Sequence, residues 1–243
     1  MNTEIVSGLR SLWKAVFNDS DAFLDAFFQI AYSPDRCRYH AQDGQILSAL
    51  YWFDCQYAGR KLAYIYAVAT DPAHRGKGLA SQLLNETHSH LKAQGYSGAV
   101  LKPAEGLFPF YERLGYRTSC YVNRCVVETG TVAAQIKALS PSEYARLRRA
   151  YLPKSGITQE GVTLEFLHTF GQFYAAADAL ICIASDRSTI FEYLGNPDSA
   201  PGILRSLGIQ QASLTTPGGK IPFAMYNPLD DAPAPCYLGI TLE

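Results

Sequence analysis

Hydrophobic spacing divides the first part of the chain into two helices and a β-rich segment. Apolar residues recur at helical spacing over residues 4–17, and again from a capping Ser20 to the break at Ser33–Pro34. Between residues 38 and 69 the pattern changes to short runs of β-forming residues, separated by turn residues. The pattern predicts antiparallel strands at 38–41, 46–53 and 62–69, with turns at Asp43–Gly44 and Ala58–Gly59.

A glycine-rich turn follows the last of these strands and precedes a third helix. Residues 74–78 read His-Arg-Gly-Lys-Gly, and apolar positions at helical spacing continue from Leu79 to Leu91 before Gly95 ends the pattern. The sequence then predicts a short strand at 99–101, a short helix at 107–114 stopped by Gly115, and an extended run at 118–128. The order strand, glycine turn, helix is the local arrangement that matters most for function.

The segment Thr129–Gly130–Thr131 is interpreted as a boundary between a domain at 1–128 and a second unit at 129–243. In the second unit we expect helices near 141–151, 161–174 and 199–207, strands at 179–184 and 189–194, and three short strands ending with 237–242. Pro217–Gly218–Gly219 is typical of a hairpin turn before a strand at 221–226. The whole pattern predicts an α/β (α+β) protein, with a mixed, mostly antiparallel sheet flanked by helices and a second, smaller α/β unit.

Composition and charge exclude some classes of protein but do not indicate a specific function. The chain is 48% hydrophobic and 18% charged with a formal net charge of -1, which is typical of globular proteins and excludes disorder. Without a basic excess, we expect neither nucleic acid nor a membrane as partner. No apolar run is long enough to span a bilayer, and Glu4 and Arg10 stand where a signal peptide needs an apolar core. We therefore expect a cytoplasmic protein.

The cysteines do not indicate a metal or redox site, and the clustered arginines do not indicate a binding site. The six cysteines include no C-x-x-C pair and no cluster with histidine at metal-ligand spacing, so we expect reduced thiols and no metal. Arg146, Arg148 and Arg149 lie close together in the predicted helix at 141–151 and are interpreted as a solvated face.

The glycine turn has the properties of an anion-binding site. Glycines at 76 and 78 allow backbone angles that other residues rarely adopt, so successive N–H groups can point into one concavity. The positive end of the following helix lies behind them, and Arg75 and Lys77 can add charge. These residues predict a phosphate cradle.

This arrangement resembles the GCN5-related N-acetyltransferase (GNAT) family over residues 1 to about 128. The family's pyrophosphate loop reads Gln/Arg-x-x-Gly-x-Gly/Ala, matched here by Arg75, Gly78 and Ala80. A strand ending at residues 66–72 precedes the loop, a helix follows it, and Phe-Tyr-Glu-Arg-Leu-Gly-Tyr stands at 110–116, as the family has them. The second half is similar to a partial copy of the same fold, without a CoA loop.

The resemblance implies an acetyl-CoA-dependent N-acetyltransferase that transfers acetyl to a primary amine of an unidentified acceptor, a small molecule or a peptide, by direct attack in a ternary complex. It implies that main-chain groups near Val68 and Thr70 bind the pantetheine arm like an added strand. It implies that Tyr111 is the general acid that protonates the departing thiolate. The cofactor-binding residues are then Val68, Ala69, Thr70, Arg75, Gly76, Lys77, Gly78, Leu79, Ala80 and Ser81, with acetyl-CoA as co-substrate and no metal.

Two departures from the family pattern leave parts of the site open. Many relatives carry asparagine about seven residues before the tyrosine, where this chain has Ala104. The strand at 62–70 carries no carboxylate, so no general base is assigned; the candidates weighed are Asp54, Tyr64, Tyr66 and Glu105. An aromatic group could line an acceptor pocket, although alternation sends about half of it to the core: Tyr51, Trp52, Phe53, Tyr57, Tyr64 and Tyr66.

Two other classes of function remain as alternatives. A non-catalytic acyl-CoA-binding or sensing module would explain the unassigned base and Ala104. A dinucleotide-binding enzyme is disfavoured, because the glycines do not form G-x-G-x-x-G and antiparallel strands precede the loop. The family typically opens with a strand that this chain lacks, so we expect the second unit to cover the sheet edge left open. The acceptor and the oligomeric state are not indicated by the sequence.

Overall fold

The computed structural model describes residues 3–176, 178–187 and 189–242, which fold into two compact units. Unit 1 contains Met1–Asp54, Arg60–Arg117 and Tyr226–Pro233. Unit 2 contains Cys55–Gly59, Thr118–Met225 and Ala234–Glu243. Each unit therefore includes residues from both sides of position 128. Among the described residues, no helix has the length and apolar character that crossing a membrane requires.

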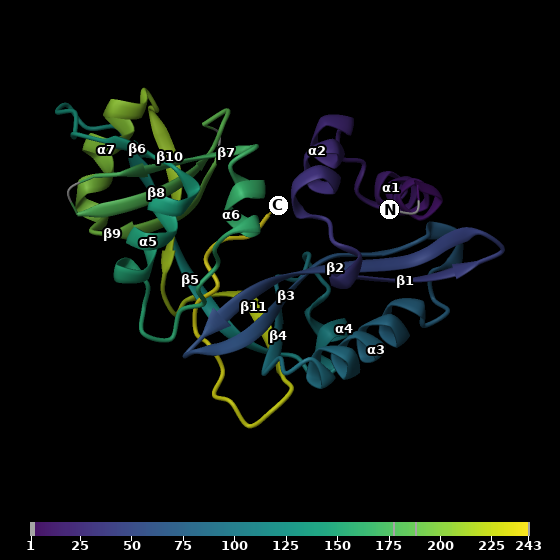
Figure 1. The fold of residues 1–243 in the computed structure, drawn as a ribbon. Helices are drawn as coiled ribbons and strands as arrows, with labels where there is room; N and C mark the ends of the chain where they lie inside the picture. The colour runs from purple at the N-terminus through teal and green to yellow at the C-terminus, as the bar shows by residue number, and fades with distance from the viewer. Residues whose placement is uncertain (1–2, 177, 188, 243) are drawn as a thin grey trace. The chain divides into compact units, whose positions relative to one another are not determined.

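Unit 1 is built from strands with helices on both faces. α1 and α2 lie on one face of the strands, and α3 and α4 lie on the other (Figure 1). A short π-helix at Phe27–Ala31 continues α2. The elements are α1 (Thr3–Phe17), α2 (Asp21–Ala26), β1 (Cys37–Gln42), β2 (Gln45–Tyr57), β3 (Arg60–Thr70), α3 (Leu79–Ala93), β4 (Gly98–Leu101) and α4 (Phe108–Glu112).

The strands of unit 1 follow the order β1-β2-β3-β4, and the end of β11 (Ile221–Pro228) lies beside β4. β1 and β2 pair antiparallel through the predicted turn, in which Asp43 and Gly44 have φ of 50° and 80°. Positive φ at both central residues matches the right-handed twist of the two strands. β3 and β4 pair parallel. The strand from the C-terminal half thus lies at the opposite end of this row from β1, and among the described residues no strand pairs with the outer edge of β1. That the second unit covers this edge stays a prediction.

Helices on both faces explain why the aromatic group does not divide between core and solvent. Tyr51, Trp52, Phe53, Tyr57, Tyr64 and Tyr66 are all at most 7% exposed. Trp13 of α1 contacts the rings of Tyr51 and Tyr66 at centroid distances of 5.3 and 5.8 Å. On the α3 side, the indole of Trp52 donates a hydrogen bond to the hydroxyl of Tyr96. The prediction that half of the group faces away from the core is therefore wrong.

Unit 2 contains a four-stranded antiparallel sheet of order β6-β7-β8-β9. β8 is buried along its whole length because α7 packs against Ile181 and Ile183 while Tyr144 of α5 stacks on Phe173 of the neighbouring β7. The elements are α5 (Pro141–Tyr151), α6 (Val162–Leu167), α7 (Ala200–Leu207), β6 (Lys137–Leu139), β7 (Gly171–Ala175), β8 (Ala179–Ala184) and β9 (Ile190–Gly195). The mixed, mostly antiparallel α/β class predicted from the sequence is confirmed.

Three predictions in unit 2 are wrong because contacts between residues far apart in the sequence decide the structure there. The expected helix at 161–174 ends at Leu167, and residues 171–175 pair with β8 as strand β7. Residues 217–219 do not form a hairpin, because β10 (Gln211–Pro217) and β11 both flank β5 (Arg117–Glu128). No strand forms at 237–242, where Tyr237 makes only an isolated bridge to Gly156.

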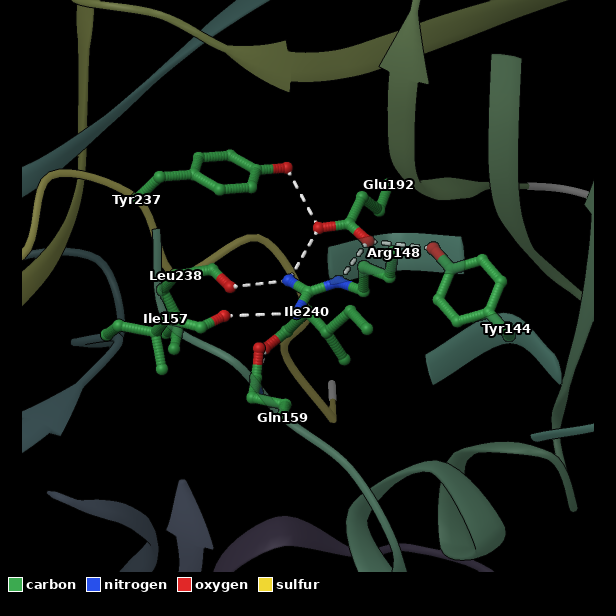
Figure 2. Close-up of polar contacts among 8 residues, drawn as sticks. All are labelled: Tyr144, Arg148, Ile157, Gln159, Glu192, Tyr237, Leu238 and Ile240. Carbon is green, nitrogen blue, oxygen red and sulfur yellow. Dashed lines mark hydrogen bonds and ion pairs between the residues drawn. The ribbon is translucent and has the colours of Figure 1, made fainter. Parts of the chain in front are cut away.

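A buried ion pair holds the C-terminal segment in unit 2. Arg148 of α5 donates two hydrogen bonds to the carboxylate of Glu192, at 2.7 and 2.8 Å, and two more to the carbonyls of Ile157 and Leu238 (Figure 2). The hydroxyls of Tyr144 and Tyr237 donate to the same carboxylate. Arg148 is 1% exposed and Glu192 0%. The interpretation of Arg148 as part of a solvated helix face is therefore wrong.

The charge of Arg148 is fixed by its partner. Burial alone would lower the pKa of its guanidinium, but the adjacent Glu192 carboxylate raises the pKa above its ordinary value. The charges of Arg148 and Glu192 thus match each other inside unit 2. The segment around Leu238 and Ile240 is held by its carbonyl groups, which accept from Arg148 and from Gln159 respectively.

Candidate active site

The predicted glycine loop links β3 to α3 in unit 1. After β3 ends at Thr70, the side chain of Asp71 accepts from the backbone N–H of Ala73 and caps a turn of 3-10 helix at Pro72–His74. Gly76 and Gly78 then have φ of 78° and 80°. A Cβ atom at either position would meet nothing within 4 Å, so the backbone angle is the reason for glycine here.

The loop delivers the start of α3 as a group of backbone donors. Gly78 is the N-cap residue, and its carbonyl accepts from the N–H of Gln82. The N–H groups of the first helical turn have no partner within a helix, and the helix dipole adds positive character to them. Open space beside both glycines and this set of donors fit a phosphate group, which requires close approach to backbone.

Hydrogen bonds to the end of β3 fix the loop. The hydroxyl of Ser48 donates to the carbonyl of Ala69 at 2.9 Å and lies 3.2 Å from the hydroxyl of Thr70. The Nε of Arg75 donates to the carbonyl of Thr70 at 3.4 Å. Ala69 therefore helps to hold the loop through its backbone carbonyl, which lies inside the sheet. The side chain of Arg75 lies against the end of β3.

β3 continues beyond its pairing with β4 toward this loop. The parallel register joins Leu62–Tyr64 with Gly98–Val100, and β3 then continues to Thr70 while β4 ends at Leu101. Ala67 has φ of 49°, an angle that a non-glycine residue rarely adopts and that marks a bulge or local strain. Sequence reasoning missed this feature, because Ala67 looks like any other residue of an apolar strand.

A cleft of about 630 Å³ lies over these elements. Eight of the ten proposed cofactor-binding residues line it, together with Tyr111, whereas Ala69 and Lys77 do not. Sequence reasoning did not propose the remaining lining residues, which are mostly apolar. The lining consists of Val16, Phe17, Val68, Thr70, Arg75, Gly76, Gly78, Leu79, Ala80, Ser81, Leu107, Phe110, Tyr111, Arg113 and Leu114.

Tyr111 reaches the cleft from α4. Its backbone N–H donates to the carbonyl of Leu107, and its ring lies edge-on to the rings of Phe110 and Tyr116, at centroid distances of 5.0 and 5.6 Å. The side chain is 7% exposed, so most of it is packed while part of it faces the cleft. This combination suits a phenol that must hold one orientation.

A second tyrosine and a histidine lie behind Tyr111. The Nε2 of His88 on α3 is 2.8 Å from the hydroxyl of Tyr116, and both residues are buried. Burial lowers the pKa of the His88 imidazole from 6.5 to about 4, and burial raises the pKa of the Tyr116 phenol well above its usual value. Both side chains are therefore neutral at pH 7.

The depressed pKa of His88 makes the stability of unit 1 depend on pH. Because the unfolded chain takes up this proton near pH 6.5 and the folded chain only near pH 4, stability is full above pH 6.5 and decreases as the pH falls toward 4. The contribution is at most about 3 kcal/mol. Urea unfolding of a His88→Gln variant should show a flatter dependence over this range; an equally steep dependence would contradict the assignment.

Charged groups are unevenly placed around the cleft. Arg75 and Arg113 line it, and no Asp or Glu is among its lining residues. None of the candidate bases lines it either. Asp54 instead belongs to a hollow on the α3 side, where it accepts hydrogen bonds from Arg36 and Tyr96. The cleft is suited to an anion at the loop and an apolar group beside it.

Comparison with known proteins defines the class of the N-terminal half. Residues 1–119 match the family described as "Acetyltransferase (GNAT) domain", so this part of the chain is a GNAT domain, as the sequence predicted. A curated relative, glucosamine 6-phosphate N-acetyltransferase from Trypanosoma brucei brucei, is 36% identical over 59 residues, which are 24% of this chain. The match spans 40% of that relative's length.

Solved structures extend the similarity of fold over nearly the whole chain. A GCN5-related N-acetyltransferase from Anabaena variabilis ATCC 29413 gives a TM-score of 0.73 at 15% identity, covering 94% of this chain and 71% of that one. One from Kribbella flavida gives 0.67 at 14% identity, covering 92% and 69%. A tandem GNAT protein from the clavulanic acid biosynthesis pathway gives 0.54 at 10% identity, covering 96% and 97%.

Proposed function

We propose that the protein is an acetyl-CoA-dependent N-acetyltransferase that acts on a primary amine by direct transfer. The observation that carries this proposal is one cleft, in a GNAT domain, that brings the glycine loop and Tyr111 together. A phosphate cradle without a nearby proton donor would support binding alone. Because the glycine loop and Tyr111 line the same cleft, the cleft supports both binding of acetyl-CoA and proton transfer to it.

Residues of this chain would hold acetyl-CoA in the following way. Backbone N–H groups from Arg75 to Ser81, with the Arg75 guanidinium, would bind the pyrophosphate. The edge of β3 at Val68 and Thr70, beyond its pairing with β4, would take the pantetheine arm as an added strand. When bound, acetyl-CoA supplies an activated thioester. The backbone N–H near Val68 would polarise its carbonyl oxygen.

Tyr111 would act as the general acid. A phenol ordinarily has a pKa of about 10, so it can carry a proton at pH 7 and give it to the CoA sulfur as the thioester bond breaks. Because no carboxylate lines the cleft among the described residues, we propose that water takes the proton of the attacking ammonium rather than a fixed side chain. Positioning and oxyanion stabilisation would then provide most of the rate acceleration.

The Tyr111→Phe variant tests this role. Loss of the hydroxyl removes the proton donor but leaves the ring packing and the glycine loop intact, so kcat should fall by about 100-fold or more while the Kd for CoA stays the same. Thiol release from acetyl-CoA measures turnover and calorimetry measures Kd. The panel of amines is glucosamine 6-phosphate, lysine, spermidine, kanamycin and a peptide with a free N-terminus.

Two comparisons decide the result. Tyr39→Phe removes the hydroxyl of an exposed tyrosine on β1, outside the cleft, and should leave both constants unchanged. If Tyr111→Phe turns over as fast as the natural protein, the residue is not the acid. If CoA binds but no amine in the panel and no water accepts the acetyl group, the chain is an acyl-CoA-binding module instead.

The C-terminal half has a proposed accessory role. We propose that residues 129–243 form a GNAT-like unit without a second CoA site, supported by the fold similarity to a tandem GNAT protein and by the lack of an Arg/Gln-x-x-Gly-x-Gly/Ala loop there. The cytoplasmic location stays a prediction.

A further inference from the structure

A short segment near the C-terminus folds as part of unit 1. Residues 226–233 belong to it, and three contacts attach them. The hydroxyl of Tyr226 and the backbone N–H of Leu229 both donate to the carbonyl of Ser97, at 3.2 and 3.0 Å. Arg60 forms an ion pair with Asp230 at 2.9 Å. Asn227 is therefore held in a defined place at the end of β11.

The amide of Asn227 makes two contacts with the region around Tyr111. Its Nδ2 donates to the carbonyl of Leu114 at 3.2 Å and lies 3.4 Å from Nδ1 of His88. A carbonyl can only accept, so the contact with Leu114 fixes which end of the amide is nitrogen. Gly115, with φ of 92°, leaves room for this amide, since a Cβ there would lie 3.2 Å from its oxygen.

These contacts determine the tautomer of His88. The imidazole is neutral at pH 7 and carries one proton. Because Nδ2 of Asn227 is a donor, Nδ1 of His88 must accept, and the ring proton resides on Nε2. Nε2 then donates to the oxygen of Tyr116, 2.8 Å away. The chain of donors runs in one direction, from Asn227 through His88 to Tyr116.

Tyr116 links this hydrogen-bonded chain to Tyr111 through direct contacts. It is fully buried, its backbone N–H donates to the carbonyl of Tyr111 at 3.2 Å, and its ring meets the ring of Tyr111 edge-on. Asn227 also holds the carbonyl of Leu114, in the turn between the two tyrosines. Rotation of either ring would disturb these packed contacts.

We infer that Asn227 is a positioning residue for Tyr111, acting through His88, Tyr116 and the Leu114 carbonyl. Asn227 is not itself among the residues that line the cleft, although its amide bonds the carbonyl of Leu114, which does line it, and it sets the orientation in which the phenol of Tyr111 faces the cleft. The inference rests on the proposed role of Tyr111 as general acid. It also makes the N-terminal domain depend on a residue from the far end of the chain.

The test is a double-mutant cycle with Tyr111→Phe, using acetyl-CoA and the amine of the panel that reacts fastest. Asn227→Ala should lower kcat by roughly 10-fold to 100-fold, because a small misplacement of an acid is costly, and should leave the Kd for CoA unchanged. In the Tyr111→Phe background the same substitution should have no further effect on kcat, since the positioned group is already absent.

A matched control comes from the same strand. Tyr226→Phe removes one hydrogen bond that attaches the segment, leaves the amide of Asn227 in place, and should not change kcat. Nitrogen NMR of the His88 ring gives a readout that does not depend on activity: Nδ1 should show the shift of an unprotonated acceptor in the natural protein. In Asn227→Ala the tautomer should become mixed. Should Asn227→Ala fail to fold, Asn227→Ser carries the same comparison with one donor in place of two.

The outcomes separate this inference from the proposed function. Full turnover by Tyr111→Phe would overturn the acid role and the inference together. A second outcome would overturn the inference alone. In it, Tyr111→Phe lowers kcat and Asn227→Ala lowers kcat by a further factor in the Tyr111→Phe background, so that the amide acts independently of the phenol. A proton on Nδ1 of His88 in the natural protein would also overturn it.

Discussion

Gly78→Glu is expected to weaken CoA binding by about 100-fold or more, equivalent to roughly 2.7 kcal/mol. The residue is the N-cap of α3 and lines the cleft, so a carboxylate there would face the phosphates and fill the space they need. A carboxylate at a helix N-terminus is favourable for the helix itself, so the fold should persist despite the φ of 80°. Calorimetry with CoA measures the loss.

Two glycine variants separate charge from backbone strain. Gly78→Ala shares the positive φ but adds only a methyl group, which meets nothing within 4 Å, and should weaken binding far less. Gly44→Glu places the same side chain at a φ of 80° in the β1–β2 turn, away from the cleft, and should bind CoA normally. Normal CoA binding by Gly78→Glu would place the phosphates elsewhere.

Arg148→Met is expected to lower the free energy of unfolding of unit 2 by about 3–5 kcal/mol. The substitution leaves the Glu192 carboxylate fully buried with only the hydroxyls of Tyr144 and Tyr237 as donors. It also removes one donor each from the carbonyls of Ile157 and Leu238. An unpaired buried charge costs more than the ion pair itself contributes. Urea unfolding followed by circular dichroism measures the change.

The double variant Arg148→Met/Glu192→Leu is the control for this effect. With both charges removed, no ion remains buried, and the free energy of unfolding should be closer to that of the natural protein than either single variant. Arg149→Met, one residue along α5, removes an exposed arginine that pairs with Glu160 and should change stability by less than about 1 kcal/mol. A small loss in Arg148→Met would show that water reaches Glu192.

Local patterns predicted most of the elements. α1, α3 and α5 begin and end within about two residues of the predicted bounds, because their caps and apolar stripes are signals between near neighbours. The predicted strand at 179–184 coincides with β8. The helix expected at 161–174 failed, since the spacing of Phe166, Phe170 and Phe173 fits a helix, while pairing of residues 171–175 with β8 overrides it.

The sequence predicted which segments form the candidate site, but it did not predict all the residues that line the cleft. The glycine turn was predicted as a phosphate cradle from its own residues, and the family resemblance added Tyr111. The structure places most of these residues along one cleft. The apolar residues Val16, Phe17 and Leu107 of its wall were missed, because exposed or half-buried apolar side chains look like core positions in a sequence. The positive φ of Ala67 likewise leaves no local mark.

The sequence by itself determined the glycine turn, the helix that follows it and the order of elements typical of a GNAT domain, because each depends on residues within a few positions of one another. Only the tertiary structure decided that Arg148 lies buried against Glu192 and that Asn227 reaches His88. These contacts join residues 44 and 139 positions apart. Such pairs have no fixed spacing, so which polar residues meet depends on how the strands and helices pack.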